Sequence, residues 1–157
     1  MCTLHVFNGD KKTKSLHLLQ IIKDFEWNSD GCSAVLLDKS NSVFMRVQCL
    51  HVAELAEVIR RTEASTYIVH MRAATTWTQG VGGCHMFDTT SGDWIYCHNG
   101  IIHAGRGLRV DSLILDDSLD NVFPDELDTL EYGFANVIAY HHDTRMIMIH
   151  RSTGGSL

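Results

Sequence analysis

The sequence predicts a single α+β domain in which strand hairpins alternate with pairs of helices. Three observations support this. The chain has 157 residues, which suits one domain with a sizeable core. Its apolar fraction is 45% with a single proline, as in ordinary globular proteins. Short strand-like runs bounded by Gly, Asn and Asp alternate with amphipathic helical segments.

Charge and cysteine content narrow the function classes. A net charge of −6 argues against a nucleic-acid partner, because binding phosphates requires a basic face. Five cysteines without CxxC spacing argue against a disulfide framework or a zinc ribbon, and favour a reducing, cytoplasmic compartment. We see no leader and no apolar run long enough for a membrane span, so no membrane partner is expected.

The N-terminal third predicts a strand, a helix and a hairpin. Residues Cys2–Phe7 form the strand, and Asn8-Gly9-Asp10 is a turn. The KKTK run at 11–14 is expected to be a solvated loop. The helix is predicted over Ser15–Phe25, with Ser15 as N-cap and a core-facing stripe of Leu16, Leu19, Ile22 and Lys23.

A hairpin and a second helix follow. Asp30-Gly31 is expected to be a turn that opens the hairpin, whose strands are Ala34–Leu37 and Val43–Val47. The segment Val52–Arg61 predicts an amphipathic helix with the stripe Val52, Leu55, Ala56 and Ile59.

The rest of the chain predicts further strands and two short helices. Strands are expected at Thr66–Ala74, at Trp94–Cys97, and in a hairpin of Asn136–Tyr140 with Met146–His150. Helices are expected at Asp111–Leu119 and Pro124–Tyr132. The adjacent His141 and His142 are interpreted as turn residues, because neighbouring strand residues face opposite ways.

Three motifs carry polar groups at strand ends: HMRAATT (70–76), GCHMF (83–87) and CHNGII (97–102). The arginine of the first can bond both oxygens of a carboxylate. The Asn-Gly pair of the third offers a side-chain amide and an unhindered backbone N–H, which suit a developing oxyanion.

With the Met-Cys start, the order of these motifs resembles the class II glutamine amidotransferases, which are N-terminal-nucleophile (Ntn) hydrolases. The resemblance runs from Cys2 to about Leu157, so residues 1–157 are expected to form one amidotransferase-type domain. It implies a four-layer αββα sandwich of two mostly antiparallel sheets. The family's usual synthase domain is missing, which implies that a separate synthase subunit can be a partner.

The resemblance also implies roles for six residues. Cys2 is the nucleophile, on an inner strand close to Asn99 and Gly100, which hold the oxyanion. Arg72 binds the α-carboxylate of glutamine or a related amide, and Thr75 lies in the same pocket. Asp111 binds the α-ammonium, although it can equally be a helix cap. No cofactor or metal is implied.

Two alternatives remain open at this point. The reaction requires removal of Met1, because the α-amine of Cys2 serves as the base. If Met1 is retained, the chain is a catalytically silent Ntn-fold binding or regulatory protein. A Cys/His metal module using Cys84, His85, Cys97 and His98 is less favoured, because paired neighbours diverge on a strand.

Overall fold

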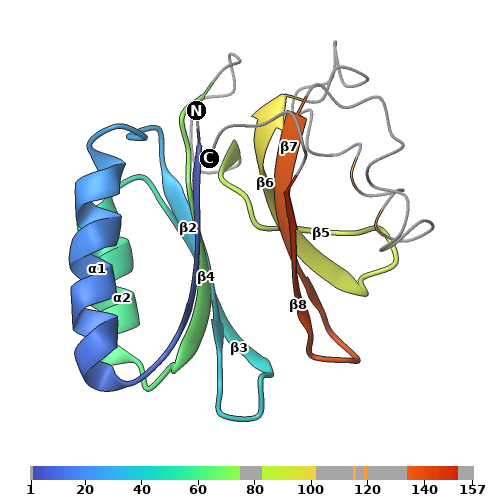
Figure 1. Ribbon diagram of the computed structural model, residues 1–157, viewed down its shortest axis with the longest axis horizontal. Helices are drawn as coiled ribbons and strands as arrows, with labels where there is room; N and C mark the ends of the chain where they lie inside the picture. Colours follow the sequence, from blue (N-terminus) through green and yellow to red (C-terminus); the bar gives the residue numbers. More distant parts are fainter. Residues whose placement is uncertain (1, 75–82, 102–114, 116–118, 120–133, 152–157) are drawn as a thin grey trace.

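Two antiparallel four-stranded sheets face one another, and a pair of helices covers the outer face of the first (Figure 1). This arrangement comes from a computed structural model, which describes residues 2–74, 83–101, 115, 119 and 134–151. The expected α+β sandwich is therefore confirmed.

The first sheet has the order β1-β4-β2-β3. Its strands are β1 (Thr3–Asn8), β2 (Cys32–Leu37), β3 (Val43–Cys49) and β4 (Thr66–Met71). The predicted hairpin is confirmed as β2 and β3. Among the described strands β1 pairs with β4 alone, so Cys2 precedes an edge strand. The expectation of an inner strand was wrong, because β4 and not β1 takes the position between two partners.

The second sheet has the order β5-β6-β7-β8. Its strands are β5 (Phe87–Asp88), β6 (Trp94–Ile101), β7 (Phe134–His141) and β8 (Ile147–Arg151). The expected C-terminal hairpin is confirmed as β7 and β8. β6 continues through Asn99-Gly100, both of which pair with β7, so this dipeptide lies within a strand and not after its end.

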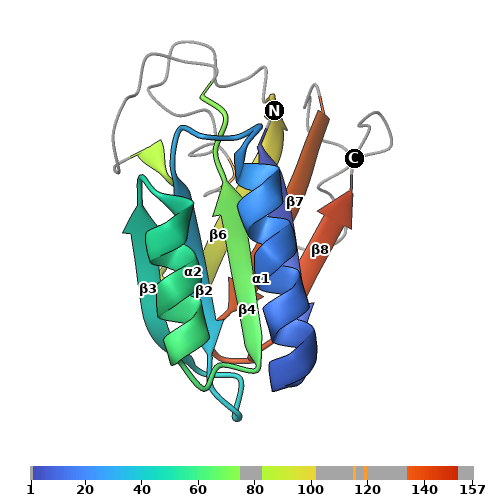
Figure 2. The ribbon, with the colours of Figure 1, turned by 90° about the vertical axis from the view of Figure 1, so that its left-hand side faces the viewer.

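Helices α1 (Lys11–Phe25) and α2 (Val52–Arg61) lie side by side on the first sheet (Figure 2). The bounds of α2 and its buried stripe agree with the sequence prediction. None of the described helices is long and apolar enough to cross a bilayer.

The start and the packing face of α1 differ from the prediction. Asp10, not Ser15, is the N-cap, since its carboxylate accepts a 2.8 Å hydrogen bond from the N–H of Thr13. The KKTK run is therefore helical. The buried face is Lys14, Leu18 and Ile21, whereas the predicted core residues Leu16, Leu19 and Ile22 are exposed.

Three apolar clusters follow from the alternation of strand residues. The first lies between the helices and the first sheet, and the second fills the space between the two sheets. The third covers the outer face of the second sheet and includes Leu115 and Leu119, which are buried there in helical conformation. These two leucines belong to the predicted helix 111–119. The predicted helix 124–132 lies outside the described residues.

Candidate active site

Cys2 lies where β1 begins, at the same end of the sandwich as the end of β6 (Figures 1 and 2). Leu4 and Val6 belong to the cluster between the sheets, so by alternation Cys2 also faces the second sheet. Its thiol is half-buried and lies 3.7 Å from the carbonyl oxygen of Ala73. The edge strand therefore still directs Cys2 toward the second sheet.

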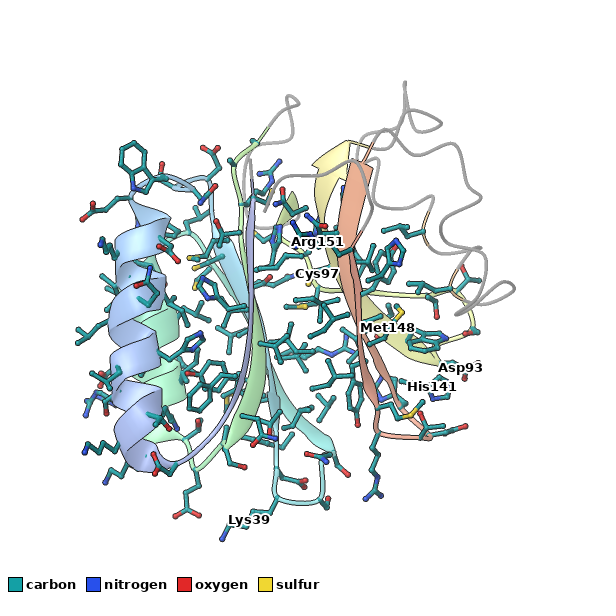
Figure 3. All side chains as sticks on the ribbon, viewed as in Figure 1. Lys39, Asp93, Cys97, His141, Met148 and Arg151 are labelled. Atoms are coloured by element: carbon teal, nitrogen blue, oxygen red, sulfur yellow. The ribbon has the colours of Figure 1, made fainter. Side chains whose placement is uncertain are left out.

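Cys97 is a residue of the second sheet that lies near Cys2. It lies between the two sheets (Figure 3). Burial raises the pKa of the Cys97 thiol, and the nearby Cys2 thiol raises it further. Asn99 follows two residues later on the same strand face. The nucleophile candidate and the oxyanion candidate thus belong to the same end of the space between the sheets.

The backbone at Gly100, directly after Asn99, has a conformation that favours glycine. Gly100 has φ +149°, a conformation that side-chain-bearing residues rarely adopt. Asn99 is 8% exposed, and its Oδ1 has no hydrogen-bond partner among the described residues. A buried amide of this kind can serve a ligand, since water reaches it poorly.

Arg72 lies directly after β4, and its side chain is buried. A Cβ atom at Gly83 would come within 2.9 Å of the Arg72 Cζ, so glycine is the residue that lets the guanidinium pack against this backbone. Burial raises the pKa of the neighbouring Cys84 thiol, while the charge of Arg72 opposes that shift. Arg72 is therefore a buried cation among the described residues at this end of the molecule.

The Asp30-Gly31 segment holds the chain that follows β4. The Arg72 N–H donates to the Gly31 carbonyl at 2.8 Å, and the Asp30 N–H donates to the Arg72 carbonyl at 3.0 Å. The Asp30 carboxylate accepts a 2.7 Å hydrogen bond from the Ala74 N–H. Gly31 has φ +126°, and a Cβ there would collide with the Cys84 Sγ. Asp30 forms a bend and not the expected turn, and these bonds hold the backbone beside Cys2.

Three buried histidines form a stack beside Arg72. The rings of His70 and His85 are 4.3 Å apart, and those of His85 and His98 are 5.2 Å apart. Burial lowers the pKa of His70 to about 3, helped by His98 and Arg72. Burial also holds the pKa of His85 well below its usual value. His70 and His85 are therefore uncharged near neutral pH, and the stack links the two sheets.

Met1, Thr75 and Asp111 lie outside the described residues. Within residues 2–74, 83–101 and 134–151, no three His, Cys, Asp or Glu side chains gather in a way that could hold a metal ion. His141 closes the β7–β8 turn, where its Nδ1 accepts 3.2 Å hydrogen bonds from the N–H groups of Asp143 and Thr144.

Sequence reasoning missed one polar residue on this face. Asn136 of β7 lies directly opposite Asn99 and is 5% exposed. The signal was its alternation with Ile138 and Tyr140, which are buried between the sheets. A polar residue at the end of an apolar strand face is therefore a candidate site residue.

Comparisons with known proteins add a fold-level likeness. No protein-family model and no curated protein matches the sequence. Among solved structures, the chain is similar to glutamine phosphoribosylpyrophosphate (PRPP) amidotransferase from B. subtilis, solved with ADP and GMP. The match has a TM-score of 0.60 at 14% identity and covers 96% of this chain. It covers 37% of that chain, so this chain spans little more than a third of that protein's length.

Proposed function

We propose that this protein hydrolyses the side-chain amide of glutamine, or of a related amide, with Cys2 as the nucleophile. One observation carries the proposal. On a fold similar to that of a glutamine amidotransferase, Cys2 directly precedes β1 and faces the second sheet at the end where Asn99 and Gly100 lie. A nucleophile, an oxyanion site and the buried cation Arg72 then belong to one end of the molecule.

The reaction follows from these groups. After removal of Met1, the free α-amine of Cys2, with an ordinary pKa of about 8, accepts the thiol proton. The sulfur attacks the amide carbon, and the Asn99 amide and the Gly100 N–H stabilise the resulting oxyanion. The C–N bond breaks, and ammonia leaves with the transferred proton. Water then cleaves the thioester, which releases glutamate and restores the thiol.

Substrate binding is assigned to Arg72, Thr75 and Asp111. The guanidinium of Arg72 suits the α-carboxylate, because its planar fork matches two oxygens. The proposed roles of Thr75, in the same pocket, and Asp111, on the α-ammonium, rest on the family resemblance. Ammonia can remain free or pass to a separate synthase subunit, and the reaction as proposed requires no cofactor.

The test is release of ammonia and glutamate from glutamine. Wild-type protein is expected to produce equal amounts of both, and Cys2→Ala neither, with an unchanged circular dichroism spectrum. Cys49→Ala is the matched control, because it removes a buried thiol from β3, the opposite edge strand of the same sheet. Ammonia release that persists in Cys2→Ala would contradict the proposal. A folded wild type that retains Met1 and releases nothing would favour the silent Ntn-fold protein.

A further inference from the structure

Asn136 is a buried polar residue without a role in the reaction described above. It lies in β7 directly opposite Asn99 of β6. Residues directly opposite in an antiparallel pair share a face, with Cβ atoms about 4.5–5.5 Å apart. The two amides are therefore neighbours on the face of the second sheet that looks toward the first.

The hydrogen-bonding needs of the two amides are complementary. Among the described residues, neither Nδ2 nor Oδ1 of Asn136 has a partner, and Oδ1 of Asn99 also has none. Burial without a partner costs free energy for each of these atoms. One hydrogen bond from Asn136 Nδ2 to Asn99 Oδ1 would satisfy a donor and an acceptor together.

Among the described residues, the neighbours of this pair on the same face that lie toward the core are apolar. The next pair along the two strands is Cys97 and Ile138, both of which belong to the apolar cluster between the sheets. An amide can rotate about its terminal side-chain bond, so Asn136 can turn its Nδ2 toward Asn99 without moving the backbone. The neighbouring amide of Asn99 is thus the natural acceptor.

The orientation of Asn99 decides whether it can stabilise an oxyanion. Its Nδ2 is a donor and its Oδ1 an acceptor, so only one of the two orientations of the amide is productive. We propose that Asn136 is a positioning residue, which donates to Asn99 Oδ1 and thereby directs Asn99 Nδ2 toward the reacting carbonyl. This inference rests on the proposed function, since it assigns Asn136 a role in that reaction.

Steady-state kinetics with glutamine tests the role. Loss of an oxyanion donor lowers kcat by about 10²–10³-fold, which is the expectation for Asn99→Ala. We expect Asn136→Ala to lower kcat at least about tenfold while KM changes little. Asn136→Asp should be as damaging as Asn99→Ala, because an ionised carboxylate only accepts and would turn Asn99 Nδ2 toward itself. The control Ile138→Val alters the next residue on the same face and should leave kcat within about twofold.

A double-mutant cycle separates positioning from an independent effect. In the Asn99→Ala background, Asn136→Ala should lower kcat no further, because the group that it orients is already absent. Three outcomes would overturn the proposal. They are a wild-type kcat in Asn136→Ala, a rise in KM without a fall in kcat, and a kcat of the double variant that is reduced by the product of the two single losses.

The stability of the wild type, Asn99→Ala, Asn136→Ala and the double variant gives a readout that does not depend on activity. In urea unfolding, the two substitutions should be coupled, because each removes one end of the same hydrogen bond. If the two changes in unfolding free energy are strictly additive, Asn136 and Asn99 are not joined by a hydrogen bond, and the proposal is wrong. A wild type that hydrolyses no glutamine would overturn the proposed function and the catalytic role of Asn136 with it, and the stability cycle would then decide the amide pair by itself.

Discussion

The carboxylate of Asp30 accepts a 2.7 Å hydrogen bond from the backbone N–H of Ala74, 44 residues away in sequence. This bond holds the chain that follows β4 next to Cys2, whose thiol lies beside the carbonyl oxygen of Ala73. The Asp30-Gly31 segment therefore acts as a clamp on the backbone of the candidate site.

Loss of the Asp30 carboxylate is expected to disturb the site more than the fold. Asp30→Ala should lower the free energy of unfolding by only about 1 kcal/mol, because the bond is exposed, and should lower kcat for glutamine severalfold. Asp30→Asn keeps an acceptor oxygen and should recover much of the activity. Asp143→Ala, in the exposed β7–β8 turn, is the control. An unchanged kcat in Asp30→Ala would exclude the clamp.

Arg72→Lys tests the carboxylate site. Arginine bonds a carboxylate through two parallel N–H groups, whereas lysine offers a point charge, so KM for glutamine should rise far more than stability falls. A ligand that binds only the native state raises the melting temperature. An unreactive glutamine analogue should therefore stabilise the wild type and fail to stabilise Arg72→Lys. Equal thermal shifts in both proteins would show that Arg72 does not hold the substrate.

Gly100→Ala tests the backbone beside Asn99. Gly100 has φ +149° and Gly92 has φ +79°, so alanine strains the chain at both positions. Each substitution should cost about 1 kcal/mol or more of unfolding free energy, measured in urea. Only Gly100→Ala should abolish glutamine hydrolysis, because Gly92 lies in an exposed turn with open space around it. Similar activity in the two variants would contradict the assignment of the Gly100 N–H to the oxyanion.

The histidine stack predicts a loss of stability in acid. His70 has a pKa of about 3 in the folded protein and an ordinary value of 6.5 when unfolded, so the unfolded chain binds the proton first. Its contribution is complete above pH 6.5 and is lost as pH falls toward about 3, by about 1.4 kcal/mol per pH unit.

His70→Phe keeps a planar ring in the stack and should flatten the pH dependence of the free energy of unfolding, measured in urea, by about that slope between pH 6.5 and 4. His51→Phe, at an exposed position, is the control. Parallel curves for wild type and His70→Phe would mean that His70 titrates alike in the folded and unfolded states.

The fold was largely predictable because its signals are local. Helix α2 has one apolar stripe, so its bounds and packing face followed from periodicity. Helix α1 has apolar residues on two stripes. Its choice of face depends on Lys14, whose Nζ donates to the carbonyls of Thr62 and Ala64 at 2.8 and 3.1 Å across the neighbouring helix end. Such a tertiary contact leaves no trace in local sequence.

The candidate site was predictable only where its chemistry lies in short motifs. Cys2, Arg72 and the Asn99-Gly100 pair were proposed as site residues from the order of these motifs and the family resemblance that the order carries. Asn136 depends on the register of β6 with β7, which pairs it with Asn99. Register is set by long-range pairing and is invisible in a single strand.

The most direct test of the central claim is the mass of the chain before and after treatment with a diazoketone analogue of glutamine, followed by peptide mapping. We expect a protein that lacks Met1 and carries one covalently bound analogue molecule on the Cys2 sulfur. Cys2→Ala should remain unmodified, although the other four cysteines are present. A chain that keeps Met1, or an adduct on any cysteine other than Cys2, would contradict the central claim.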